Sequence, residues 1–290
     1  MRSSACLVAM TLALAPSRSF AQQPPTARDI VERIKQTIGV PWTEPTVDAF
    51  KDGDPATPVT GVAVTMMATF DVLRRAADRG ANLVITHEPT FYDHFDKLDV
   101  LEAERDAVTA QKRAFIREHH MVVVRMHDHW HRRHPEPMAT DLARVLGWER
   151  YRGASEFLYR LPETRLADLA ATIRRRLPAP TLRLVGDSTM RVTQIALSPG
   201  AAGFTRHRQF LQQDDVDVLV IGEAHEWETV EYVADAVTAG RRKALIILGH
   251  VPSEQDGMAE FAQWLGTFVK EVPVTFVPAA DPFWGPVHTP

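Results

Sequence analysis

The stretch Ala81-Asn-Leu-Val-Ile-Thr-His87-Glu88-Pro89 decides the fold, because it combines a short apolar strand with two metal-capable side chains at the end of that strand. Two later stretches share this design, Met121-Val-Val-Val-Arg-Met-His127 and Ala244-Leu-Ile-Ile-Leu-Gly249-His250. Functional sites in open α/β sheets lie outside the carboxyl ends of the strands. We therefore expect an α/β fold in which the three strand ends build one metal centre.

The residues just before this stretch predict a parallel sheet. An alternating strand over 59–67 and a helix over 70–79, for which Thr69 supplies a cap, precede the strand at 83–86. A strand, a helix and a second strand in this order form a βαβ unit with a right-handed crossover, in which the two strands lie parallel. The apolar strands would then end at the same edge of a sheet.

The chain of 290 residues is long enough for two domains. A change in composition near residues 147–154 divides it. We expect a first α/β lobe over residues 22–150 and a second over 151–290 that ends with a strand at 274–277, and we expect the lobes to be interleaved. The net charge of −4 argues against nucleic acid as a partner, because that partner requires a broad cationic face.

The N-terminus has the pattern of a signal peptide over residues 1–21. Arg2 supplies the positive charge, residues 5–15 are apolar, and Ser19-Phe20-Ala21 is a small-x-small cleavage site. We therefore expect an exported protein, periplasmic or secreted, that has no contact with the membrane after cleavage. Cleavage also removes Cys6, the only cysteine. Any metal would then be held by His and carboxylate ligands, which favours Zn, Mn, Fe or Ni.

Four histidines and one aspartate lie within eight residues after the second apolar strand, namely His127, Asp128, His129, His131 and His134. Both an extended and a helical turn keep His127 and His131 on one face. This arrangement predicts metal ligands that point into one site. The alternative is an exposed His-rich loop with nonspecific affinity for metals.

The third apolar strand leads into His250 and Glu254, which lie four residues apart at the start of a predicted helix. Ser253 is a natural cap for that helix, so Glu254 could instead serve only the helix start. A further polar strand end offers candidate acid–base or outer-shell groups. These groups are Glu223, His225 and Glu226, for which a solvated turn is the alternative.

Taken together, these motifs resemble the NGG-interacting-factor-three-like family, also called the type-two GTP cyclohydrolase I family or dinuclear-metal-centre hexameric proteins. The resemblance spans roughly residues 27–264 and includes residues 80–89, Ile221-Gly-Glu223 and Gly249-His250-x-x-Ser253-Glu254. It implies a two-lobed α/β unit, a dinuclear metal site in the cleft between the lobes, and a homohexamer. Carried onto this chain, the ligands are His87, Glu88, His127, His131, His250 and Glu254.

Two of these positions depart from the family pattern. The family has a second His where this chain has Glu88, and it has an Asp where this chain has His131. The exchange of one His and one carboxylate conserves the net charge of the ligands, which is typical of a compensated metal site. It also leaves Asp128 and His129 as alternative ligands in place of His131.

Two hypotheses for the function remain at this point. The first is a hydrolase that uses a metal-bound hydroxide on a small amide, ester or cyclic C–N substrate, with proton transfer by Glu223, His225 or Glu226. An exported protein would meet little GTP, so the family label does not fix the substrate. The second is a non-catalytic oligomer that binds, stores or delivers metal, a role that the additional His129 and His134 would suit.

Overall fold

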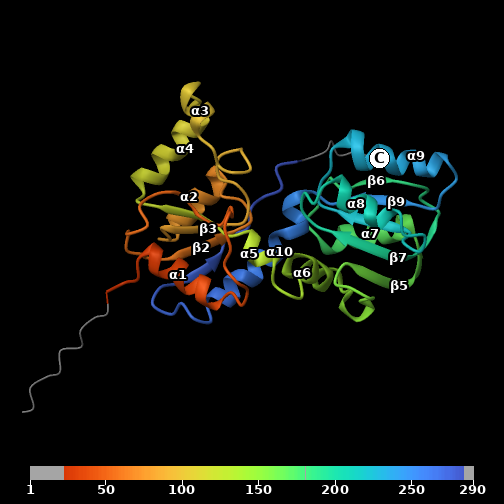
Figure 1. Cartoon of the computed structure of the whole chain (residues 1–290), viewed down its shortest axis with the longest axis horizontal. Helices are drawn as coiled ribbons and strands as arrows, with labels where there is room; N and C mark the ends of the chain where they lie inside the picture. The colour runs from red at the N-terminus through yellow and green to blue at the C-terminus, as the bar shows by residue number, and fades with distance from the viewer. Residues whose placement is uncertain (1–22, 180, 284–290) are drawn as a thin grey trace, which may run out of the picture.

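The structure, a computed structural model, describes residues 23–179 and 181–283. The expected signal peptide, residues 1–21, lies outside the described residues. Figure 1 shows two lobes, each built around a five-stranded mixed sheet. The expected two-lobed α/β fold is therefore confirmed.

The first sheet has the order β1-β4-β3-β2-β10. Strands β4, β3, β2 and β10 run parallel to one another, and the edge strand β1 pairs antiparallel with β4. The strands are β1 (Phe50–Asp52), β2 (Val62–Thr65), β3 (Leu83–Thr86), β4 (Val122–Arg125) and β10 (Val274–Phe276).

The second sheet has the order β5-β7-β8-β9-β6. Three central strands are parallel, and an antiparallel strand closes each edge. The strands are β5 (Leu158–Arg165), β6 (Arg183–Val185), β7 (Arg191–Ser198), β8 (Val218–Ile221) and β9 (Ala244–Ile247).

Helices cover both sheets and connect the two lobes (Figure 1). Within the described ranges, none of them combines the length and apolar character needed to cross a membrane. The helices are α1 (Ala27–Thr37), α2 (Phe70–Asp78), α3 (Asp99–Ala103), α4 (Ala107–Glu118), α5 (Asp128–His131), α6 (Pro137–Leu146), η1 (Glu149–Tyr151), α7 (Leu166–Arg176), α8 (Phe204–Leu211), the π-helix η2 (Glu226–Val230), α9 (Glu231–Thr238) and α10 (His250–Leu265).

The buried inner strands form because their residues are apolar, apart from a threonine at the end of β2 and of β3 and Arg125 at the end of β4. Every residue of β2, β3, β4, β8 and β9 is buried, as expected for parallel strands that are covered on both faces. The side chain of Thr69 accepts a hydrogen bond from the N–H of Val72 and caps α2, as the sequence predicts. The predicted βαβ unit is present, since β2 and β3 pair in parallel on either side of α2.

The C-terminal part of the chain returns to the first lobe. The strand that we expected to complete the second lobe pairs instead with β2, so that Val274 lies opposite Val62. The physical reason is the apolar face of α10, which buries Met258, Phe261 and Leu265 in the core of the first lobe. Helix α10 therefore starts at the second sheet and ends against the first, and it packs along α6 on the way.

Candidate metal centre

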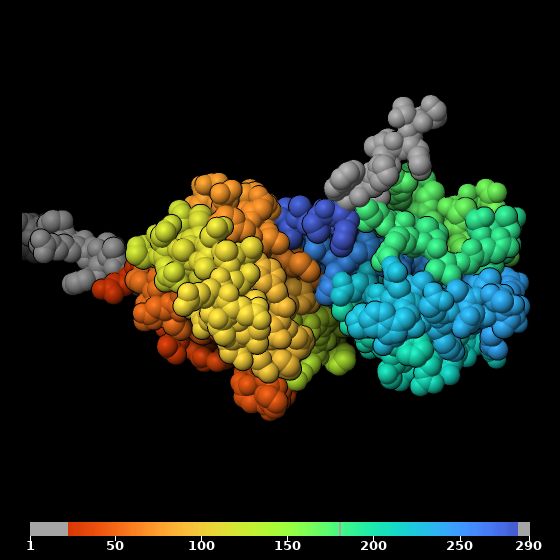
Figure 2. Space-filling view, turned by 90° about the horizontal axis from the view of Figure 1, so that it is seen from above, coloured from red at the N-terminus to blue at the C-terminus, as the bar shows by residue number. Residues whose placement is uncertain are grey.

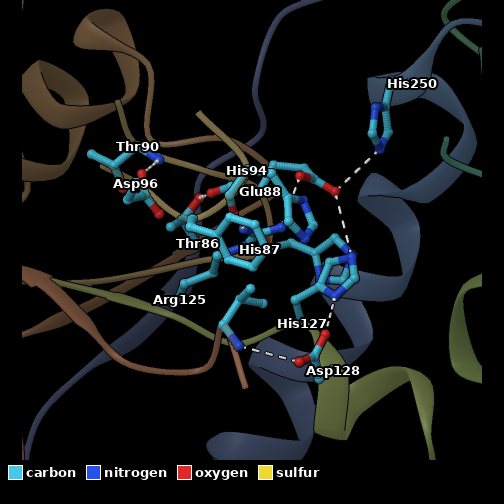
Figure 3. Close-up of polar contacts among 12 residues, drawn as sticks. Thr86, His87, Glu88, Thr90, His94, Asp96, Arg125, His127, Asp128 and His250 are labelled. Atoms are coloured by element: carbon cyan, nitrogen blue, oxygen red, sulfur yellow. Dashed lines mark hydrogen bonds and ion pairs between the residues drawn. The ribbon is translucent and has the colours of Figure 1, made fainter. Parts of the chain in front are cut away.

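Six His and Glu side chains converge where the carboxyl ends of the first sheet meet the start of α10. Figure 3 shows His87, Glu88, His127 and His250 of this cluster. Strands β3 and β4 are parallel neighbours, so the residues that follow them leave the sheet side by side. The potential ligand atoms of His87, His127 and His131 lie within 4.8 Å of one another, and the same holds for His87, Glu88 and Glu254. The six residues are His87, Glu88, His127, His131, His250 and Glu254.

His87 and His131 point their Nε2 atoms at each other. The Nδ1 of His87 donates to the carbonyl oxygen of Met126 at 3.1 Å, and the Nδ1 of His131 donates to Oε1 of Glu136 at 2.8 Å. Each Nε2 is then left with a lone pair, and the two Nε2 atoms are 3.1 Å apart. Two lone pairs this close require a cation between them, either a proton or a metal ion.

Burial favours the neutral form of His87. Desolvation, followed by the neighbouring His127 and His131, holds the pKa of His87 well below its usual value. A neutral imidazole with a free Nε2 is the form that binds a metal. Burial also opposes protonation of His131, but Glu136 and Glu254 outweigh it and raise the pKa of this imidazole, so a proton at this end of the cluster lies on His131 when no metal is bound. A divalent cation would replace that proton, because metal ligands bind in their deprotonated form.

His127 and His250 have the same orientation as the first two histidines. The Nδ1 of His127 donates to Oδ1 of Asp128 at 2.9 Å, and the Nδ1 of His250 lies 3.6 Å from Oε2 of Glu223. Their Nε2 atoms point inward, at 3.7 Å and 3.2 Å respectively from Oε1 of Glu88. Metal-ligating histidines are typically oriented in this way, by an acceptor on the nitrogen that does not bind the metal.

Glu88 is paired with a buried arginine that the sequence analysis missed. Arg125 has no solvent exposure, and its Nη2 donates to Oε2 of Glu88 at 3.1 Å. The other guanidinium nitrogens donate to the carbonyl oxygens of His87 at 2.8 Å and His94 at 2.6 Å. The sequence contains the necessary indication, since an arginine within the apolar run 121–126 needs a buried partner.

The charges around Glu88 keep it ionised. Burial alone would raise the pKa of this carboxyl, but His250, His127 and Arg125 together hold the pKa at about 2. The Nε2 of His250 also lies 3.0 Å from Oε2 of Glu254, the second acidic residue of the cluster. Glu88 and Glu254 thus both offer carboxylate oxygens as ligands next to Nε2 of His250.

The two alternatives to His131 have other roles. Asp128 orients His127, and its second carboxylate oxygen accepts from the hydroxyl of Thr46 at 2.9 Å. The Nδ1 of His129 bonds to Oδ2 of Asp48 at 2.6 Å, and the Nε2 of His129 accepts from a backbone N–H at 3.0 Å. The imidazole of His131 is therefore the group from this segment that enters the cluster beside His127.

Of the three predicted acid–base groups, only Glu223 reaches the cluster. The side chains of His225 and Glu226 are 66% and 70% exposed, and Glu226 forms an ion pair with Arg183 at 2.6 Å. The chain turns outward after Gly222 and enters the π-helix η2, so side chains beyond Glu223 leave the site. The expectation that three acid–base groups lie together is therefore wrong for His225 and Glu226, and Glu223 alone of the three lies at the cluster.

Glycines allow the second lobe to approach Glu254. Gly200 has a left-handed φ of 67°, and a Cβ atom added there would collide with the Glu254 carboxylate. The N–H of Gly200 donates to the hydroxyl of Ser253 at 3.0 Å, which fixes the loop against α10. The backbone of the second lobe therefore positions a side chain that faces the first.

The cluster opens into a cleft between the lobes. A cavity of about 690 Å³ and a smaller hollow of about 440 Å³ share Met67, Ala201, Glu223 and His250. They are thus two arms of one cleft, which meet at His250. In Figure 2 the last described residues, drawn in dark blue, lie between the two lobes near this region.

Comparison with known proteins agrees with this architecture. The model of the Duf34/NIF3 (NGG1p interacting factor 3) family matches residues 26–282. A Bacillus cereus protein related to NIF3 is similar, with 15% identity over 90% of this chain and 99% of that one and a TM-score of 0.70. For Staphylococcus aureus protein SA1388 the identity is 19% over 90% and 99% of the two chains, with a TM-score of 0.69.

A more distant structure extends the likeness to an archaeal protein. Reduced HcgD from Methanocaldococcus jannaschii has 12% identity over 88% of this chain and 97% of that one, with a TM-score of 0.61. At such identities the solved structures show a shared fold. No curated protein matches the chain in sequence. Because the family model covers nearly all of the described residues, the resemblance found in the motifs is confirmed, and the chain belongs to the Duf34/NIF3 (NGG1p interacting factor 3) family.

Proposed function

We propose that the protein is a metal-dependent hydrolase that holds two divalent cations in the His/Glu cluster. The observation that carries the proposal is the common orientation of four histidines, each with its Nδ1 turned to an outer acceptor and its Nε2 turned inward. Two carboxylates complete a set of nitrogen and oxygen donors that suits Zn, Mn, Fe or Ni. The set lies at the junction of a cleft that can admit a small molecule.

The donors form two compact groups that share His87, which supports two adjacent ions rather than one. His87, His127 and His131 form the group of three imidazoles. Glu88 and Glu254 form the second group with His87, and their carboxylate oxygens also lie 3.2 Å and 3.0 Å from Nε2 of His250. We assign one cation to each group.

Bound divalent cations would polarise a carbonyl group and lower the pKa of a water molecule at the site. The protein itself contributes a carboxylate at the junction of both arms of the cleft, Glu223. The neighbouring His250 lowers the pKa of Glu223, so this carboxylate is ionised at neutral pH. It is half-exposed to the cleft and can accept a proton there and return it to a leaving group. A small amide, ester or cyclic C–N compound fits this chemistry.

Replacing Glu223 by Gln tests the proposal. We expect Glu223→Gln to keep its metal and to lose turnover by about 10²- to 10⁴-fold, the usual contribution of a general acid–base group. Glu231→Gln is the matched control, because it makes the same change on an exposed side chain at the start of α9, outside the lining of the cavity. A panel of amides, esters and cyclic amides would be screened with the metal-loaded protein. Full activity in Glu223→Gln would contradict the assigned role.

The alternative of metal storage or delivery finds less support. The additional histidines that suit such a role do not join the cluster, since His129 is bonded to Asp48 and a backbone N–H. The side chain of His134 is exposed and its Nδ1 is 3.8 Å from a carboxylate oxygen of Glu156. Tight metal binding without any turnover on the panel would favour this alternative.

We also propose that the protein is exported and forms a homohexamer. The pattern of residues 1–21 supports export. Self-association is supported by exposed apolar side chains on the segment formed by α3, α4 and the preceding loop. Four of the seven exposed large hydrophobic residues in the described part of the chain lie on this segment, namely Tyr92, Phe95, Val100 and Val108.

A further inference from the structure

We propose that the larger arm of the cleft is the substrate-binding cavity and that its part away from the metal cluster favours a neutral or cationic organic group with an apolar body over an anionic one. The proposal rests on the hydrolase function for the statement that the ligand is a substrate. The selectivity itself follows from the walls and charges of the cavity, and binding alone can test it.

The cavity is placed to present a ligand to the metal cluster. Its lining includes His250 and Glu223, which belong to the cluster and its edge. The same two residues line the smaller arm, whose lining also includes Glu88. A molecule bound in the larger arm would therefore place one end beside the proposed metal ligands.

Most of the cavity wall is apolar. Residues from three elements and from the last described segment line it, namely Phe204 at the start of α8, Ile247 at the end of β9, Val251 in α10, and Phe283. A volume of about 690 Å³ is within the range of sites that enclose small organic molecules. Walls of this kind favour an aromatic or aliphatic body through the removal of apolar surface from water.

The charged groups in the lining are mainly carboxylates. Glu223, Glu228 and Asp281 all line the cavity, and the lining contains one arginine, Arg183. That arginine is already neutralised by Glu226, outside the lining, at 2.6 Å. The start of α8 also faces the cavity, but a helix N-terminus is equivalent to only about half a positive charge. Away from the metal cluster, the charges of the lining therefore disfavour an anionic group.

One carboxylate oxygen in the wall lacks a hydrogen-bond donor. The Oδ1 atom of Asp281 accepts from the N–H of Phe283 at 3.1 Å, whereas its Oδ2 atom is buried and has no partner among residues 23–179 and 181–283. A buried acceptor without a partner is unfavourable, and a charged donor satisfies it most strongly. A turn of the Asp281 carboxylate toward the cavity would let an ammonium or amide N–H on the ligand fill this role.

The selectivity can be measured with two probes that share an apolar body and differ in charge, tryptamine and indole-3-propionate. Titration calorimetry after treatment with a chelator, so that the carboxylate of indole-3-propionate has no metal ion to bind, should show that tryptamine binds at least about tenfold more tightly, the ratio expected for one charge-assisted hydrogen bond. Asp281→Asn should weaken tryptamine by about tenfold and leave indole-3-propionate unchanged or tighter. Glu228→Gln should have the same kind of effect with smaller factors, weakening tryptamine and tightening indole-3-propionate.

A second pair of variants locates the binding site. Ala201→Trp should abolish binding of tryptamine, because residue 201 lines both arms of the cleft and is itself exposed. Ala239→Trp makes the same change at an exposed position at the end of α9 and should leave binding intact. Equal or tighter binding of indole-3-propionate, or unchanged tryptamine binding in Ala201→Trp, would overturn the proposal.

These outcomes separate the cavity from the hydrolase proposal. Charge-selective binding that requires the open cavity, without turnover of any substrate, would leave the selectivity intact and remove the hydrolase function. Turnover that depends on Glu223 and survives Ala201→Trp would support the hydrolase function and remove the proposed substrate cavity, because catalysis would then not use this arm of the cleft.

Discussion

Replacing Arg125 by Met should destabilise the protein more than the loss of most single side chains. Methionine keeps the unbranched apolar stem but removes every donor of the guanidinium group. Three acceptors then lose their partner, namely Oε2 of Glu88 and the carbonyl oxygens of His87 and His94. Because Arg125 is fully buried, water cannot replace these hydrogen bonds without entering the core of the first lobe.

The size of the effect follows from the burial of the pair. Removing one partner of a buried ion pair costs about 3–5 kcal/mol, because the remaining charge is left without compensation. His250 still contacts Oε1 of Glu88 at 3.2 Å, which keeps the cost within this range despite the two additional carbonyl oxygens. At about 2–4 °C per kcal/mol for a domain of this size, we expect the melting temperature to fall by roughly 6–20 °C.

Urea unfolding in the presence of a chelator measures this cost without a contribution from metal binding. The single variants Arg125→Met and Glu88→Gln and the double variant form a cycle, in which the double variant should be less destabilised than the sum by about 1–3 kcal/mol. Arg160→Met, an exposed arginine on β5, is the matched control and should change stability by less than about 0.5 kcal/mol. A cost below about 1 kcal/mol for Arg125→Met, or strict additivity in the cycle, would refute the reasoning.

Three further predictions concern other parts of the structure. Burial raises the pKa of Asp141 to about 6, so the folded state retains a proton that the unfolded state releases above about pH 4, and stability falls as the pH rises from about 4 to 6. Thermal unfolding of Asp141→Asn should therefore show a gain of roughly 1–3 kcal/mol at pH 8 and none at pH 4. Gly200→Ala should weaken metal binding, measured with a competing chelator, by at least about tenfold, because its Cβ displaces Glu254, whereas Gly203→Ala, also at a positive φ but with open space, should not. Light scattering should show a hexamer that Val108→Glu dissociates, and a monomer in the unmodified protein would contradict that assembly.

Much of the fold could be predicted because the decisive patterns are local. Apolar runs mark the buried parallel strands, and each run leads directly into a ligand-capable residue. The expectation that His87, His127 and His250 meet follows from the rule that parallel strands of one sheet end at one edge. It applies to the first two histidines, which follow β3 and β4. His250 arrives by another route, because β9 belongs to the second sheet and α10 carries the residue across.

The remaining features depend on contacts between distant segments, which local patterns do not contain. The return of β10 to the first sheet is set by the open edge of β2 and by the apolar face of α10. The outward direction of Glu226 depends on the π-helix that begins there. Glu136 was missed for a similar reason, since it caps α6 and holds His131 with the same carboxylate.

Elemental analysis of the protein, purified without a His-tag and without added metal, tests the central claim most directly. We predict about two equivalents of divalent metal per chain, lost from His87→Ala, whose ring nitrogen lies within the cluster. His134→Ala removes an exposed histidine from the same His-rich segment and should keep the full content. Circular dichroism would establish that both variants are folded. A protein that binds no metal even after reconstitution, or an unchanged metal content in His87→Ala, would contradict the assignment of this cluster as a dinuclear metal centre.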